Sequence, residues 1–104
     1  MVKYKIKWSV QAKLDLIDIL KLYLEGNGNV LYSRKLNLII KKGATQISNN
    51  PSIGVQTDND SVRAIITLDY QIIYEIFDNQ ILILMVWDCR RNPYDKRLGQ
   101  RIKV

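Results

Sequence analysis

Hydrophobic and polar residues alternate at the start of the chain and then change to a helical spacing. Between residues 2 and 8, apolar side chains alternate with lysines, a period of two that predicts a strand with one buried and one cationic face. Ser9 stands where a helix N-cap is expected. Apolar residues then follow at helical spacing in two stretches: Ala12, Leu16, Ile19, Leu20 and Tyr23, with Gln11, Asp15, Asp18 and Glu25 on the other side, and later Tyr32, Leu36, Ile39, Ile40, Gly43 and Ile47. The break at residues 26–29 predicts an antiparallel helical hairpin.

The period changes again after residue 60. Residues 48–60 are rich in turn formers and predict an irregular loop. Residues 62–68, 70–77 and 81–87 are rich in β-branched and aromatic side chains and predict three strands joined by tight hairpins. The last of them is apolar throughout, which is typical of a central strand covered on both faces. We therefore predict one α+β domain over residues 1–104, in the order β-α-α-β-β-β, with the hairpin packed on a mainly antiparallel sheet.

Charge is unevenly distributed along this basic chain. The net charge is +6, and residues 88–104 hold six Lys or Arg against two Asp, whereas residues 43–60 hold no cation. A basic end of this kind favours an acidic partner, either nucleic acid or an acidic protein segment. The alternative is that the charge only keeps a small domain in solution.

Composition excludes several kinds of chemistry. The chain has no histidine, which removes histidine-based nucleophilic schemes and histidine-ligated metal sites. Cys89 is the only cysteine, so it makes no intramolecular disulfide and no thiolate zinc site, and a reducing cytoplasmic location is expected. The first residues lack the apolar core of a signal peptide, and the longest apolar run, 81–87, is too short to span a membrane. We expect no metal, no cofactor and no membrane association.

The basic residues near the end of the chain are the remaining candidates for a functional site. Guanidinium groups suit phosphate recognition because they are planar and permanently charged. Tyr94 could stack on a base, take part in proton transfer, or pin the chain end against the sheet. Arg63 could contact a substrate or form an ion pair with Asp88 or Glu75. Trp8 and Trp87 are expected in the core. The candidate binding residues are Arg90, Arg91, Lys96, Arg97 and Arg101.

Two segments resemble a known family. They are SVQAKLDLIDILKLYLE (9–25) and NPSIGVQTDNDSVRAIITLDYQIIYEIFDNQILILMVWDCRRNP (50–93). Together, and in this order, they resemble the RelE/ParE superfamily of toxins from bacterial type II toxin–antitoxin modules, with plasmid-stabilisation-type members the most similar. The resemblance covers nearly the whole chain. It implies a growth-arresting toxin that forms a hetero-oligomer with an acidic antitoxin.

The resemblance implies one of two mechanisms. RelE-like members cut mRNA in the ribosome without a metal, and here Arg63, Arg90, Arg91 and Tyr94 would form the catalytic set. However, Tyr70 is followed by Gln71, where those members have a basic residue, and the strand 62–68 offers a single cation. ParE-like members inhibit DNA gyrase by binding it and need no such set, which favours this mechanism. A non-toxic nucleic-acid-binding module is the third alternative.

Overall fold

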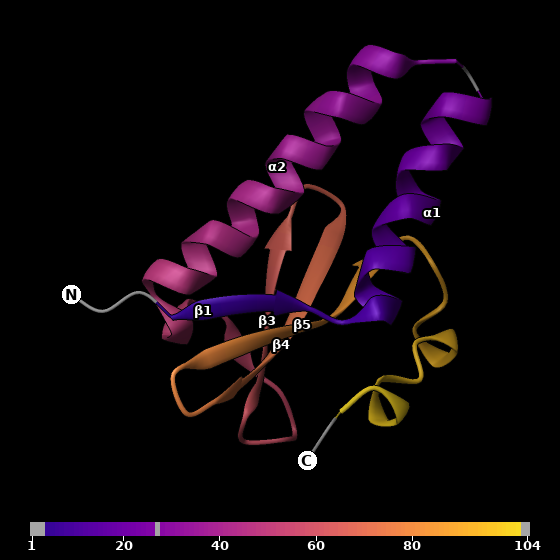
Figure 1. Ribbon diagram of the computed structural model, residues 1–104. Coiled ribbons are helices and arrows are strands. Elements are labelled where there is room, and N and C mark those ends of the chain that lie inside the picture. The colour runs from indigo at the N-terminus through magenta and orange to yellow at the C-terminus, as the bar shows by residue number, and fades with distance from the viewer. Residues whose placement is uncertain (1–3, 27, 103–104) are drawn as a thin grey trace.

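The computed structural model describes residues 4–26 and 28–102 of the chain (Figure 1). Its elements are β1 (Lys5–Trp8), α1 (Val10–Gly26), α2 (Val30–Asn49), the short 3-10 helix η1 (Pro51–Ile53), β2 (Val55–Gln56), β3 (Val62–Thr67), β4 (Tyr70–Phe77), β5 (Gln80–Asp88), and the 3-10 helices η2 (Pro93–Asp95) and η3 (Leu98–Gln100). The residues after β5, 89–102, are called the C-terminal segment below.

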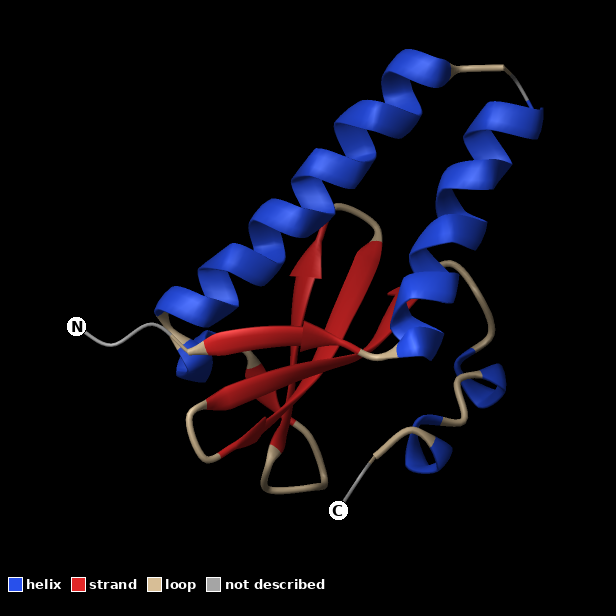
Figure 2. Cartoon of the chain, viewed as in Figure 1, coloured by secondary structure: helices blue, strands red, loops and turns tan. Residues whose placement is uncertain are grey.

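The strands form one five-stranded sheet in the order β1-β5-β4-β3-β2. Strand β1 is parallel to β5, and the other neighbours are antiparallel. The hairpin of α1 and α2 lies against this sheet (Figure 2). The predicted α+β class and the order of elements are therefore confirmed. The loop 48–60 is the exception, because it contains η1 and the two-residue strand β2, which is too short to show an alternating pattern.

Two apolar clusters lie on opposite faces of the sheet. On the first face, α1 and α2 bury residues such as Leu16 and Ile40 against β4 and β5. On the second face, Leu98 and Ile102 of the C-terminal segment pack over a cluster that includes Met85 and Trp87. Strand β5 is thus covered on both sides, as its uninterrupted apolar sequence predicts.

Local hydrogen bonds fix the two helix starts. The Ser9 hydroxyl accepts the Ala12 amide at 3.0 Å, so Ser9 caps α1 as expected. The Asn29 side chain accepts the Tyr32 amide at 3.0 Å and caps α2. Neither helix, over its described residues, is long and apolar enough to cross a lipid bilayer.

Candidate functional site

Arg90 is held at the end of β5 by a carboxylate and a tyrosine. Its guanidinium donates to both carboxylate oxygens of Asp88 at 2.9 Å and to the Tyr70 hydroxyl at 3.2 Å. This bidentate arrangement is the strong form of an arginine–carboxylate pair. It lowers the pKa of the Asp88 carboxyl below its usual value, mainly through the hydrogen bonds from the Arg90 side chain.

Tyrosines continue this cluster onto the helical hairpin. The Tyr23 and Tyr70 hydroxyls lie 3.3 Å apart, and the Tyr23 ring packs on Tyr32 with centroids 4.6 Å apart. Burial raises the pKa of Tyr70, whereas the hydrogen bonds from Tyr70 and Arg90 lower the pKa of Tyr23. Arg90 therefore belongs to a network on the face of the sheet that carries the helices.

Arg91 and Lys96 lie around Trp87, which belongs to the second-face cluster, and Arg91 also borders a hollow between α1 and Asp88. The Arg91 guanidinium is 4.5 Å from the Trp87 ring centroid, and the Lys96 ammonium is 5.6 Å from it, both within cation–π range. Lys96 also donates to the Gln71 side chain at 2.7 Å. Trp87 is buried, as expected, and Trp8 is half-buried against the helix-face core.

Arg101 ties the C-terminal segment to the rest of the fold. Its guanidinium forms a bidentate ion pair with Asp15 of α1 and donates to the Leu84 carbonyl oxygen at 3.3 Å. Asp15 also accepts the Val86 amide at 3.1 Å. The expectation that Asp15 lies on the outer side of α1 is therefore wrong, because β5 supplies donors that a helical pattern does not reveal.

The other predicted site residues are Arg97, Tyr94 and Arg63. Arg97 is exposed and has a left-handed backbone at φ 50°. The side chain of Tyr94 lies outside the described part of the structure, so its predicted roles stay predictions. Arg63 donates to the Gly54 carbonyl oxygen at 2.8 Å. The alternative of an Arg63–Asp88 ion pair is wrong, because the two residues stand opposite different positions of β4, Tyr74 and Tyr70.

Register shows how far Arg63 is from the other candidates. Arg63 pairs with Tyr74, whereas Asp88 pairs with Tyr70, four residues away along β4. Four residues of a strand correspond to roughly 13 Å. Arg63 therefore lies opposite the middle of β4, away from the end where Asp88 and Arg90 lie, and Arg90 and Arg91 contact different partners, Tyr70 and Trp87.

Sequence reasoning missed the partners of these cations. Asp15, Tyr23, Tyr70 and Gln71 come from segments distant in sequence, and only Tyr70 and Gln71 were singled out beforehand, as a match to and a departure from a family pattern. Within residues 4–26 and 28–102, no three Asp, Glu or Cys side chains are grouped so that they could hold a metal ion.

A helical hairpin on this sheet, with a basic C-terminal segment, is the architecture of RelE/ParE superfamily toxins. Residues 6–93 match the family described as ParE toxin of type II toxin–antitoxin system, parDE. The chain belongs to this family and is the toxin component of a toxin–antitoxin module.

Two solved structures share the fold. A chain of the chromosomal ParDE toxin–antitoxin system from P. aeruginosa superposes with a TM-score of 0.69 at 18% identity, covering 81% of this chain and 94% of that one. A chain of the toxin–antitoxin complex RelBE2 from Mycobacterium tuberculosis gives 0.60 at 20% identity, covering 82% and 96%. No protein with a curated description matches the sequence.

Proposed function

We propose that this toxin arrests growth in the cytoplasm as ParE-like proteins do, by binding DNA gyrase, and that its antitoxin neutralises it by binding. The observation that carries the proposal is the separation of the three arginines of the predicted catalytic set. A metal-independent nuclease must place several cations around one scissile phosphate. Arg90 binds Asp88 and Tyr70, Arg91 stacks on Trp87 of the second-face cluster, and Arg63 pairs with Tyr74 in the middle of β4, roughly 13 Å along the strand from Tyr70.

The internal partners of these cations support the same proposal. Arg90 is paired with Asp88 and Tyr70, although its side chain is 56% exposed, and Arg101 is paired with Asp15. Leaving such partners for a phosphate would have an energetic cost that an open cation avoids. Arg91 and Arg97 are exposed, and they are the residues of the C-terminal segment that we assign to contact with the target.

The alternative is a RelE-like ribosome-dependent mRNA endonuclease. It would require Arg90 to leave Asp88 and join Arg91 at the phosphate, with Tyr94 assisting proton transfer. A cell-free comparison separates the two mechanisms. A gyrase inhibitor should stop DNA supercoiling and trap cleaved DNA while translation of an existing mRNA continues. Codon-specific mRNA cleavage with intact supercoiling would overturn the proposal.

Two substitutions sharpen this test. Arg91→Ala should weaken gyrase inhibition about tenfold, because it removes an exposed cation that Trp87 positions. Lys35→Ala, at an exposed cation of α2, is the matched control and should leave inhibition unchanged. Equal losses in both variants would show that inhibition follows total charge, and no loss in Arg91→Ala would remove Arg91 from the contact.

A further inference from the structure

One edge of the sheet has only a short strand beside it. Strand β2 is two residues long and pairs with Ala64 and Arg63, so the outer edge of β3 from Ile65 onward has no neighbouring strand in the described structure. Before β2 the chain forms η1 and Gly54 instead of a longer strand, so β2 does not reach the position opposite Ile66.

The backbone at this edge is directed outward. The Val62 amide donates to Asn59, and the Val62 carbonyl oxygen accepts from Thr57, both on the β2 side of β3. Backbone groups alternate in direction along a strand, so the amide and carbonyl of Ile66 also point away from β4. They are the donor and acceptor that an added strand would use.

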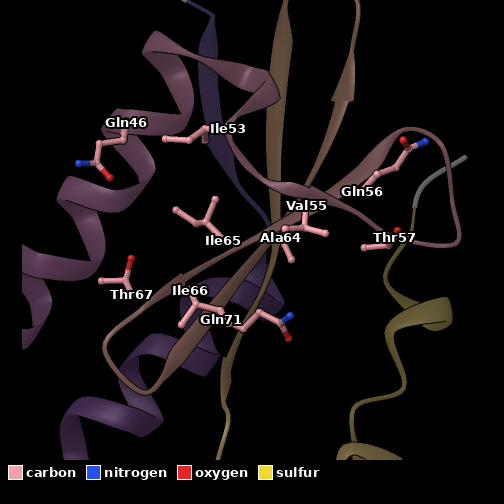
Figure 3. A pocket seen from close by; sticks show the side chains of 10 residues that line it. All are labelled: Gln46, Ile53, Val55, Gln56, Thr57, Ala64, Ile65, Ile66, Thr67 and Gln71. Atoms are coloured by element: carbon pink, nitrogen blue, oxygen red, sulfur yellow. The ribbon is translucent and has the colours of Figure 1, made fainter.

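A hollow of about 610 Å³ lies along this edge (Figure 3). Gln46 of α2, Ile53 of η1 and Ile65, which packs against the helix-face cluster, lie on one side, and Ile66 and Gln71 lie on the other. None of the residues that line it is charged: they are aliphatic side chains, amides and threonine hydroxyls. Such a lining suits a peptide backbone with apolar side chains.

Exposed apolar side chains surround the hollow. Val55 is 76% exposed, Ile66 is 69% exposed and Leu68 is 56% exposed. Natural proteins usually protect an edge of this kind with lysines, proline or a covering element. Strand β3 has no lysine and no proline, which is typical of an edge that a partner covers.

Charge around the edge selects the chemistry of the occupant. At the Thr67 end, Lys96 is hydrogen-bonded to Gln71, the cross-strand partner of Ile66, and Arg91 lies with it over Trp87. At the other end, the exposed Asp58 and Asp60 lie in the loop before β3. An extended segment with an acidic residue near Lys96 and none near Asp60 fits this polarity.

We propose that an acidic, extended segment of the antitoxin binds the free edge of β3 as a sixth strand of the sheet. Its backbone pairs with Ile66, its apolar side chains cover Val55 and Ile66, and an acidic side chain lies beside Lys96. Membership of a toxin–antitoxin family supplies the partner. The inference does not depend on whether the toxin acts on gyrase or on mRNA.

The test uses the full toxin and the antitoxin encoded beside it, together with overlapping synthetic peptides of that antitoxin. Ile66→Glu places a carboxylate on the edge, and we expect antitoxin affinity to fall at least about tenfold. Leu31→Glu is the matched control, because Leu31 is 78% exposed and lies twelve residues of α2, about 18 Å, from Gly43, which packs on β3. Thermal unfolding should show that both variants remain folded.

Hydrogen exchange of the Ile66 amide provides a second, backbone measurement. We expect protection of this amide to increase when the antitoxin, or one of its acidic peptides, is bound. Unchanged exchange in the complex would overturn the proposal, as would equal affinity losses in Ile66→Glu and Leu31→Glu. Protection that appears in the isolated toxin as its concentration rises would assign the edge to a second copy of this chain and would also overturn it.

Discussion

The ion pair between Asp15 and Arg101 makes a specific prediction about stability. Strand β1 ends at Trp8 opposite Ile83, so the outer edge of β5 beyond this point has no strand beside it in the described structure. Asp15 takes the place of a strand there, because its carboxylate accepts the Val86 amide as well as two nitrogens of Arg101. Substituting Asp15 therefore removes a backbone acceptor and an ion-pair partner together.

The magnitude follows from burial. The side chains of Arg101 and Asp15 are only 22% and 19% exposed. The stability lost when one partner is removed should therefore lie between about 0.5 kcal/mol, as for an exposed ion pair, and about 3–5 kcal/mol, as for a fully buried one. An unsatisfied buried amide costs about 1–3 kcal/mol. We expect Asp15→Ala to lower the free energy of unfolding by about 3 kcal/mol and Arg101→Ala by about 2 kcal/mol.

The double variant separates the two contributions. If the pair itself contributes about 1 kcal/mol, Asp15→Ala combined with Arg101→Ala should cost about 4 kcal/mol rather than the sum of the single losses. Urea unfolding followed by tryptophan fluorescence measures these values, and Asp15→Ala should also lower Tm by about 12 °C at about 4 °C per kcal/mol.

A neighbouring aspartate on the same helix is the control. Asp18 is exposed on α1, and Asp18→Ala should change the free energy of unfolding by no more than about 0.5 kcal/mol. A loss below about 1 kcal/mol for Asp15→Ala would refute the argument that this carboxylate closes the β5 edge. Strict additivity in the double variant would show that the ion pair adds nothing to stability.

Two further predictions concern pH and packing. Arg90 lowers the pKa of the Asp88 carboxyl. The ionised carboxylate therefore stabilises the fold above its unfolded pKa of about 3.9, and this stabilisation is lost as pH falls through the lower folded pKa. In acid unfolding, Asp88→Asn should lack this loss of stability below about pH 4. In Gly54→Ala the new Cβ would lie 2.6 Å from the Tyr74 hydroxyl oxygen and 3.0 Å from a backbone carbonyl oxygen, so chemical denaturation should show a loss of about 1–3 kcal/mol. Gly26→Ala, where nothing lies within 4 Å, should be neutral, and equal effects would contradict the packing argument.

Patterns of period two and period 3.6 predicted most of the fold, because the helices and the long strands each bury a regular set of positions. Ala12, Leu16 and Ile19 are buried on α1 as their spacing predicts. Strand β2 escaped prediction because two residues define no period, and the parallel pairing of β1 with β5 depends on contacts across the whole chain. Pairing of this kind is decided by tertiary packing.

The basic residues of the C-terminal segment show why sequence proximity was a poor guide to the site. Arg90 and Arg91 are adjacent in sequence, but one binds Tyr70 on the helix face and the other stacks on Trp87 on the second face. The composition correctly indicated a basic end of the molecule. It could not show that Asp15, Asp88 and Gln71 bind three of the cations, because these partners are brought in by the fold.

Because Arg90 binds Tyr70 while Arg91 and Lys96 lie around Trp87, the two faces of the sheet present different cations. The match to the ParE family ends at residue 93, and beyond it Leu98 and Ile102 cover the middle of the second face while Arg101 fastens them to α1. The C-terminal segment therefore closes the part of that face over β5, whereas Val55 and Ile66 stay exposed at its β3 edge. A partner that approaches the second face meets Arg91, Lys96 and this apolar edge together, so charge and apolar contact act on the same segment of the partner. Association with an acidic segment at this surface should accordingly slow as salt increases, while dissociation is set by the apolar contacts at Ile66.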